Sequence, residues 1–299
     1  YQAPFPCIAW ALCCVGISAL AGERYQGKGI HDRITGVPPS AAVLDAMAAD
    51  IVAGRAEDAA YTAMENTAFY DVTLKNLSAP WTNEAMTKFV PLNDYTATVI
   101  GLVRDDADFR MVLYGNVLYE GDSSLDLSAY SVQNNNHYEE LENGGHSLKD
   151  SLVFVNQSTR NGIPPDATAG VMTSRAAAHA FLKDGTNRAL FRFTVLNHFC
   201  NDMEQLNDTS LPSDRIRQDI SRSPGGDSRI YLNSCIGCHN GMDPLTQAFA
   251  YYNYDYNVEI NTEGLNGRLV YNGVGMIDAI THSRRQKKST NHTGNFKYS

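Results

Sequence analysis

The chain has 299 residues, of which 43% are hydrophobic, enough for one large domain or two small ones. It carries 24 basic and 33 acidic residues, a formal net charge of −9. An acidic chain without a basic stripe is a poor candidate for binding nucleic acid. The one basic cluster, residues 284–288, lies in a polar C-terminal tail and is interpreted as solvated.

Residues 7–21 are uncharged and almost wholly apolar, and they end in Ala19-Leu20-Ala21, an A-x-A cleavage pattern. This run is shorter than the roughly 20 residues of a comfortable transmembrane helix. It predicts a signal peptide over residues 1–21 whose charged start is missing, so we expect truncation there; the alternative is a buried apolar helix. We therefore expect a periplasmic, secreted or cell-surface bacterial protein without a membrane span in its mature part.

Residues 22–125 are predicted to form an N-terminal helical region, because their apolar residues recur at helical spacing. Ser40 is the expected N-cap of the first of these helices, and Gly54 its end. The predicted helices cover residues 41–53, 56–64, a segment starting at Pro80-Trp81 with Thr82 as its cap, 94–104 and 109–114.

Residues 121–161 are polar and contain Asn and Gly clusters, so we predict mostly loop there and a linker over 126–165. Two helices are then predicted over 171–182 and 189–200, and Pro212 can open a short third one. Residues 166–270 are assigned to a second module, and 271–299 to a polar tail.

The segment Cys235-Ile236-Gly237-Cys238-His239 has the C-x-x-C-H spacing of covalent haem attachment. Two thiols can add to the two vinyl groups of one haem, and the adjacent histidine then binds the iron as proximal ligand. The motif occurs once, so we predict one covalent haem c. A C-x-x-C pair also occurs in zinc sites and in redox motifs. Haem is favoured because no second Cys/His pair accompanies the motif and no βαβ pattern precedes it.

The other cysteines agree with this interpretation. Three of them fall within the predicted signal, so the mature chain would keep Cys200, Cys235 and Cys238. Cys200 ends an apolar run and is predicted to be a buried, unpaired thiol. A disulfide between Cys200 and a motif cysteine would contradict haem attachment.

From Cys235 to Asp255 the sequence reads C-x-x-C-H-x-x-M-D-P-L-x-x-A-F-A-x-Y-x-x-D. It resembles the C-terminal haem module of bacterial exported, cytochrome-like proteins of unknown function. Looser similarity extends over residues 90–260, while Leu245-Thr246-Gln247 replaces the usual Leu-Gly-Phe. The looser similarities lie at residues 106–119, 169–173, 186–188, 192–200 and 216–217. The resemblance implies a mainly α fold: a helical domain with a C-terminal cytochrome c-like haem module and long loops.

Several residues near the motif have candidate roles. Met242-Asp243-Pro244 is expected to form a turn, in which Asp243 either accepts a hydrogen bond from the His239 ring or caps a following helix. Arg215 and Arg217 can pair with haem propionates, although surface ion pairs are the simpler role for at least one of them. Three aromatic residues are candidates for packing on the macrocycle or for plain core positions: Phe249, Tyr251 and Tyr252.

The distal iron ligand is not fixed by the sequence. The candidates are His198, His179 and Met276, and an open or water-ligated iron is the alternative. A second metal site at His137 and His146 with Glu139 and Glu140, and a calcium site at residues 105–108, are weaker alternatives; the latter is more simply an acidic helix start.

The sequence therefore predicts an exported mono-haem protein that transfers electrons to or from a redox partner protein. Two alternatives remain: a peroxidase- or oxidase-type haem enzyme with an open distal site, and a structural module of a surface complex that haem stabilises.

Overall fold

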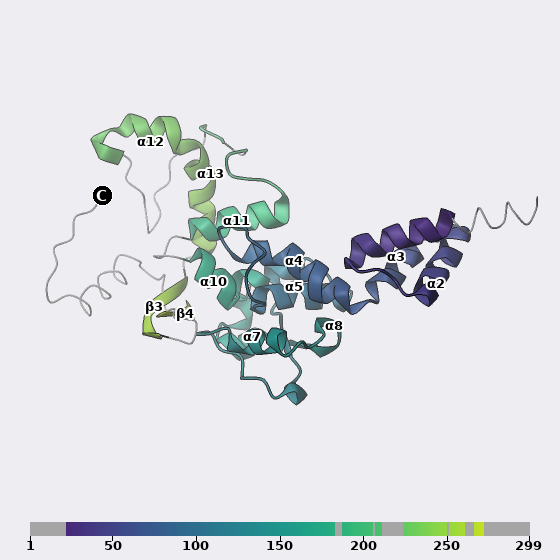
Figure 1. Cartoon of the computed structure of the whole chain (residues 1–299). Helices are drawn as coiled ribbons and strands as arrows, with labels where there is room; N and C mark the ends of the chain where they lie inside the picture. Colours follow the sequence, from purple (N-terminus) through teal and green to yellow (C-terminus); the bar gives the residue numbers. More distant parts are fainter. Residues whose placement is uncertain are drawn as a thin grey trace, which may run out of the picture. The chain divides into compact units, whose positions relative to one another are not determined.

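A computed structural model describes residues 22–182, 187–205, 207–210, 224–249, 251–260 and 266–271. The protein is mainly helical, as predicted (Figure 1). The predicted signal, the helix expected from Pro212, both candidate propionate partners Arg215 and Arg217, Met276 and the tail beyond Tyr271 lie outside the described residues.

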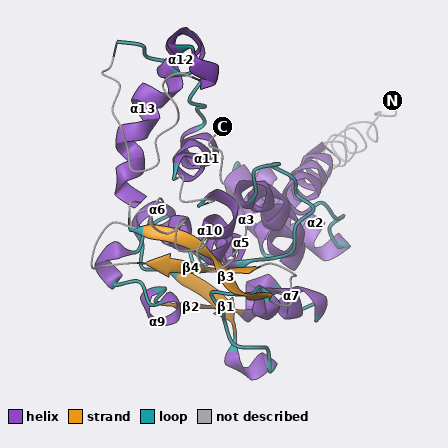
Figure 2. Cartoon of the chain, turned by 90° about the vertical axis from the view of Figure 1, so that its left-hand side faces the viewer, coloured by secondary structure: helices purple, strands orange, loops and turns teal. Residues whose placement is uncertain are grey.

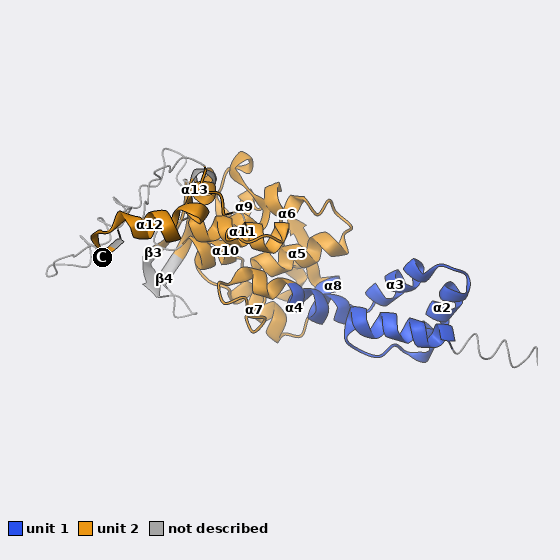
Figure 3. Ribbon diagram, turned by 90° about the horizontal axis from the view of Figure 1, so that it is seen from above, with its two compact units in different colours: residues 1–77, 147–150 blue, residues 78–146, 151–299 orange. Residues whose placement is uncertain are grey.

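Two compact units make up the chain (Figure 3). One consists of residues 1–77 with 147–150, and the other of residues 78–146 with 151–299. The packing therefore does not follow the division predicted at 126–165. That stretch is also not mostly loop, because it contains the three helices α7, α8 and α9 and the strand β2.

The first unit is a helical bundle in which α2 and α3 match predicted helices, whereas the helix over residues 22–35, η1 and α4 were not predicted individually. Residues 22–35 are helical, and α2 (Ala41–Val52) and α3 (Ala56–Met64) follow. Ser40 caps α2 as expected, because its side chain accepts a hydrogen bond from the Val43 amide at 3.3 Å. The buried core consists of Met47, Ala59 and Ala63, with Ile30, Ile34, Val43 and Ile51 packed around it. The helices that follow are η1 (Phe69–Leu74) and α4 (Lys75–Ser78).

The second unit carries the remaining elements. Helix α8 (Leu148–Ser151) lies in the first unit except for its last residue. The helices and helical turns of the second unit are η2 (Ala79–Thr82), α5 (Asp94–Arg104), α6 (Met111–Tyr114), η3 (Ser123–Leu125), α7 (Asn136–Asn143), α9 (Ser158–Asn161), η4 (Pro165–Ala167), η5 (Gly170–Thr173), α10 (Arg175–Phe181), α11 (Arg188–Phe199), η7 (Pro224–Gly226), α12 (Ser228–Ser234), α13 (Ile236–Thr246) and η8 (Gln247–Phe249).

The prediction of a helix that starts at Pro80, with Thr82 as its cap, is wrong. Residues 79–82 form a single 3-10 turn that ends at Thr82, whose hydroxyl donates to the Ala79 carbonyl at 2.8 Å. The chain then continues without helix to Asn93, the N-cap of α5. Thr82 thus donates a hydrogen bond to a carbonyl of the turn that it ends, and it does not open a helix.

Helix α5 is the centre of the second unit, because its residues from Asp94 to Leu102 are all buried. It contacts β1 and α10 among other elements. The Asp94 carboxylate accepts hydrogen bonds from the backbone amides of Arg175 at 2.6 Å and Ala176 at 3.0 Å, and from the Tyr130 hydroxyl at 3.1 Å. These bonds fix the start of α10 against the start of α5.

Two antiparallel sheets of two strands each complete the second unit, and the second of them, β3–β4, is a hairpin (Figure 2). Strand β1 (Leu118–Gly121) pairs with β2 (Leu152–Val155), and β3 (Tyr252–Ile260) pairs with β4 (Asn266–Tyr271). The local sequence does not predict these strands, because β2 is a four-residue apolar run inside a polar stretch and β3 reads as an aromatic cluster. Short strands of this kind depend on their partner for stability.

Helices α10, α11 and α13 lead from the core of this unit to the C-x-x-C-H motif. Helix α10 packs on α5 and on α11, and α11 packs on α13. The predicted helix over 171–182 is divided into η5 and α10, whereas that over 189–200 is confirmed as α11. Among the described residues, no helix combines the length and the apolar character needed to cross a membrane.

Candidate metal centre

The C-x-x-C-H motif begins helix α13. Helix α12 ends at Ser234, Cys235 forms the turn between the helices, and α13 starts at Ile236. Helical spacing of three, four, seven and eight residues places Cys238, His239, Met242 and Asp243 on the same side of α13 as Cys235. The two thiols and the imidazole therefore share one face, as attachment to a single haem requires.

The turn predicted at Met242-Asp243-Pro244 is wrong, because α13 continues through these residues to Thr246. A proline inside a helix removes a backbone donor and crowds the carbonyl four residues earlier, and α13 ends two residues after Pro244. Asp243 therefore lies within the helix and does not cap a later one. Its side chain points to His239 instead.

Cys235 and Cys238 are unpaired and partly exposed. Burial raises the pKa of the Cys238 thiol above its usual value, and the acidic neighbours Glu204 and Asp202 act in the same direction. A C-x-x-C redox pair works through a thiolate whose pKa is lowered. The raised pKa of Cys238 favours its neutral thiol, and two unpaired, partly exposed thiols are what thioether attachment needs.

Asp243 joins His239 to Arg188. Its Oδ1 and Oδ2 lie 3.1 and 3.2 Å from His239 Nδ1, and Arg188 Nε donates to Oδ1 at 2.8 Å. The carboxylate side chain is 1% exposed, compared with 10% for Arg188 and 14% for His239. Burial acts to raise the pKa of Asp243, but the hydrogen bonds from His239 and Arg188 outweigh burial, and the pKa is lowered.

The lowered pKa determines which nitrogen of His239 carries the proton. An ionised carboxylate has no proton to donate, so Nδ1 of His239 must be the donor in this contact. In the neutral ring Nε2 then carries the lone pair, which is the form that binds a metal. The structure thus confirms the hydrogen-bonding role that was one of the two expected for Asp243.

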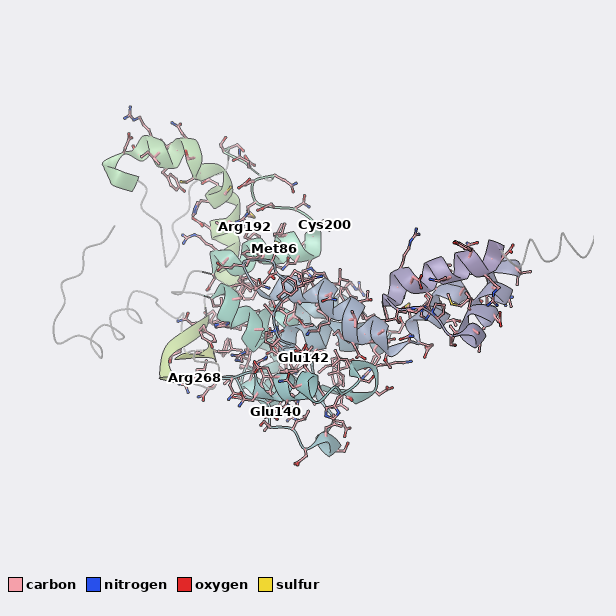
Figure 4. All side chains as sticks on the ribbon, in the orientation of Figure 1. Met86, Glu140, Glu142, Arg192, Cys200 and Arg268 are labelled. Carbon is pink, nitrogen blue, oxygen red and sulfur yellow. The ribbon has the colours of Figure 1, made fainter. Side chains whose placement is uncertain are left out.

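Two residues that follow α11, Met203 and Asn207, lie against α13. The Asn207 side chain packs directly on the Gly237 backbone, where a Cβ atom would overlap it, and Met203 is buried beside Gly241. The Asp202 carboxylate forms an ion pair with the Arg192 guanidinium of α11, with Oδ2 and Nη2 2.7 Å apart. Figure 4 labels Arg192 within α11 and Cys200 at the end of this helix. Glycine inside the C-x-x-C-H motif is therefore needed for close packing.

Helix α12 supplies aromatic and apolar side chains next to the motif. Tyr231 is buried, and its ring centre lies 6.0 Å from that of His239. Ile230 and Leu232, on either side of it in sequence, are 47% and 54% exposed. A large apolar ligand attached at the adjacent cysteines could bury part of this surface.

The two histidines predicted as distal ligands have other contacts. His198 Nε2 lies 2.7 Å from the Tyr95 hydroxyl, and its ring meets that of Trp81 edge-on at 5.3 Å. Burial lowers the pKa of His198 to about 4. His179 packs against Tyr254 at 5.3 Å and lines a cavity of about 290 Å³ together with Arg175 and Glu139. Binding of iron through His198 Nε2 would require loss of the bond to Tyr95.

Other predictions are corrected by the packing. Cys200 is unpaired but exposed, not buried, because it lies at the C-terminal end of α11 with a φ of +55°. His137 does not form a metal site: its Nδ1 donates to the Ser128 carbonyl at 2.7 Å, and its Nε2 accepts from the Gly121 amide at 2.9 Å. Both ring nitrogens are thus used by the backbone.

The acidic stretch 105–108 does not open a helix either. Asp105 ends α5, where it binds Arg104 at 2.7 Å and accepts from the Tyr119 hydroxyl at 2.6 Å. Asp108 forms an exposed ion pair with Arg110. Neither aspartate is arranged as a calcium ligand, because each faces a cationic or hydroxyl partner.

The aromatic residues after α13 belong largely to the β3–β4 hairpin. Tyr252 is buried, packs against Phe249 and Tyr271, and donates its hydroxyl to the Ala167 carbonyl. Tyr251 is 39% exposed. Tyr252 is therefore a core residue of the hairpin, the simpler of the two roles considered.

Arg188 is the residue of this site that sequence reasoning missed. It lies 55 residues before Asp243, at the start of a different helix. Its only signal was the loose similarity of Thr186-Asn187-Arg188 to the exported cytochrome-like proteins. Over the part of the chain that is described, no group of three or more His, Cys, Asp and Glu residues is arranged to hold a metal ion on its own.

Comparison of the chain with protein-family models, with curated proteins and with solved structures gives no match.

Proposed function

We propose that this protein is an exported, mono-haem c-type protein that transfers electrons to or from a redox partner protein. Cys235 and Cys238 would hold the haem through thioether bonds, and His239 would bind its iron. When bound, the haem supplies an iron that changes its charge by one electron. The observation that carries the proposal is the orientation of His239, with Nδ1 held by a buried carboxylate and Nε2 left for a metal.

The described residues fit this cofactor in three respects. The thiols are unpaired and partly exposed, and helical spacing places them on the face that also carries His239. The hydrogen bond from His239 to Asp243 is the kind that fixes a metal-binding imidazole in one tautomer. Exposed apolar side chains of α12 lie next to the motif. The weak resemblance to exported cytochrome-like proteins supports the same assignment.

Each residue has a role derived from its own contacts. Asp243 orients the ring of His239 and keeps a proton on Nδ1. Arg188 holds Asp243 in its ionised form through the 2.8 Å contact. Gly237 lets the Asn207 side chain pack closely against the motif, where a Cβ atom would overlap it.

Haem attachment tests the proposal directly. The full chain is expressed in bacteria with a haem-attachment system, and covalent haem is measured with a pyridine haemochrome assay on the denatured protein. We expect one haem per chain in the wild type and none in the Cys235→Ala/Cys238→Ala variant. Cys200→Ala is the matched control, because it removes an exposed thiol outside the motif and should retain full haem content.

The absorption spectrum of the native protein then separates electron transfer from its alternatives. Sharp low-spin bands after reduction support electron transfer, since both axial positions would be filled. A high-spin spectrum that shifts on addition of azide would instead favour ligand binding or peroxide chemistry. Absence of covalent haem from the wild type would overturn the proposal altogether.

A further inference from the structure

Arg188, Asp243 and His239 form a buried series of contacts between α11 and α13. We propose that Arg188 and Asp243 are positioning residues that hold His239 with Nδ1–H directed to the carboxylate, and that Asp243 thereby shifts the one-electron reduction equilibrium toward ferric iron. This inference rests on the proposed function, and it adds the direction in which these residues tune the site.

The first step is the placement of charge. Asp243 Oδ1 is shared by Arg188 Nε at 2.8 Å and His239 Nδ1 at 3.1 Å, while Oδ2 is 3.2 Å from the same imidazole nitrogen. The carboxylate is 1% exposed, so water screens it little. Its negative charge therefore acts strongly on the nearby His239 imidazole and Arg188 guanidinium.

The second step is the effect on a metal bound at Nε2. A carboxylate that accepts the proton at Nδ1 makes the imidazole a more basic ligand. A more basic ligand stabilises the more positively charged ferric iron over ferrous iron. A haem held at this site would accept one electron from a partner protein, and His239 would keep its Nδ1 proton hydrogen-bonded to Asp243 throughout.

The third step concerns Arg188. An ion pair with buried partners keeps the carboxylate ionised and fixes the direction of Oδ1. The positive charge of Arg188 also offsets part of the negative charge that Asp243 presents to His239. Arg188 and Asp243 are therefore expected to act on the reduction equilibrium in opposite directions.

A first experiment needs no haem. The full chain is labelled with ¹⁵N-histidine, and the tautomer of His239 is read from its ring nitrogen shifts at pH 8. We expect a proton on Nδ1 in the wild type and a shift of the proton toward Nε2 in Asp243→Ala. Asp108→Asn, which removes a carboxylate from an exposed ion pair, serves as the control and should leave His239 unchanged. A wild-type ring protonated at Nε2 would overturn the inference.

A second experiment measures the reduction equilibrium of the haem-loaded protein by spectroelectrochemistry at pH 8. We expect Asp243→Asn to raise the equilibrium constant for reduction about tenfold, equivalent to about 59 mV for one electron. Asparagine has nearly the same shape and retains an acceptor oxygen, so the variant changes the charge while keeping the packing. Arg188→Gln should lower the constant below that of the wild type, and Asp108→Asn should stay within about twofold of it.

The outcomes separate this inference from the proposed function. If the wild type carries no covalent haem, the proposed function fails, and the NMR experiment still decides the orientation of His239. If haem attaches but Asp243→Asn leaves the equilibrium unchanged, the proposed function stands and the inference is wrong. A change of the same sign in Arg188→Gln and Asp243→Asn would overturn the compensating role of Arg188.

Discussion

Helices α5 and α13 each bring a buried aspartate near a buried or partly buried arginine, but the two carboxylates face different groups. Asp94 of α5 accepts hydrogen bonds from two backbone amides of α10 and from a tyrosine hydroxyl. Asp243 of α13 faces an imidazole that lies beside two partly exposed thiols. Burial alone therefore does not distinguish the two carboxylates; the chemistry of their partners does.

The pKa directions reflect the same difference. Burial raises the pKa of Asp94, even though Arg175, backbone amides and Tyr130 act against it. For Asp243 the hydrogen bonds from His239 and Arg188 outweigh burial, and its pKa is lowered. The first carboxylate is bonded to groups that build the fold, whereas the second keeps its charge next to a candidate metal ligand.

The histidines beside these helices differ in the ring nitrogen that they use. His198 has Nε2 engaged by Tyr95 of α5, and burial lowers its pKa to about 4. His239 has Nδ1 engaged by Asp243 of α13, which leaves Nε2. The first arrangement is typical of a core histidine, and the second of a metal ligand.

The largest expected effect is at Asp94. Replacing Asp94 with Ala should lower the free energy of unfolding by about 3 kcal/mol, because two backbone amides and the Arg175 charge would lose a buried partner. Chemical denaturation followed by circular dichroism measures this change. Asp94→Asn, which retains one acceptor oxygen, should cost less; equal stability of the wild type and the alanine variant would contradict the structural role of Asp94.

A smaller effect is expected at His198 as the pH falls. The unfolded histidine, with a pKa of about 6.5, takes up a proton more readily than the folded one, whose pKa is lowered to about 4. Stability from this residue is therefore complete above pH 6.5 and is lost as the pH falls toward 4. Between pH 7 and pH 5 the loss should be about 2 kcal/mol.

Denaturation curves of the wild type and His198→Gln at the two pH values provide the measurement. The variant has no titrating ring, so the difference between its curve and that of the wild type isolates this contribution. An identical pH dependence in both proteins would show that His198 is not held neutral by the fold.

The smallest effect is expected at Arg110. Its ion pair with Asp108 is exposed, and side chains of this kind contribute little to stability because water and salt screen them. Arg110→Ala should therefore have the same denaturation midpoint as the wild type. A clear loss of stability in this variant would contradict the expectation that an exposed carboxylate pair contributes far less than a buried carboxylate such as Asp94.

Much of the helical structure could be predicted from the sequence, because it depends on local patterns. The bounds of α3 and α5 match the predicted ones, and those of α2 and α11 lie within one residue of them. In each case apolar residues recur at helical spacing. The strands β2 and β3 were missed because their stability comes from a partner strand instead of from a local pattern.

The sequence by itself determined the C-x-x-C-H motif and the helical spacing that places its thiols and imidazole on one face. Only the tertiary structure decided that Asp243 faces His239 within a continuous helix, that Arg188 supports it from 55 residues away, and that His198 is engaged by Tyr95. The physical reason is that these interactions act over different separations along the chain. Helix periodicity acts over a few residues, whereas a buried charge is satisfied by whichever partner the packing of distant helices brings within hydrogen-bond distance.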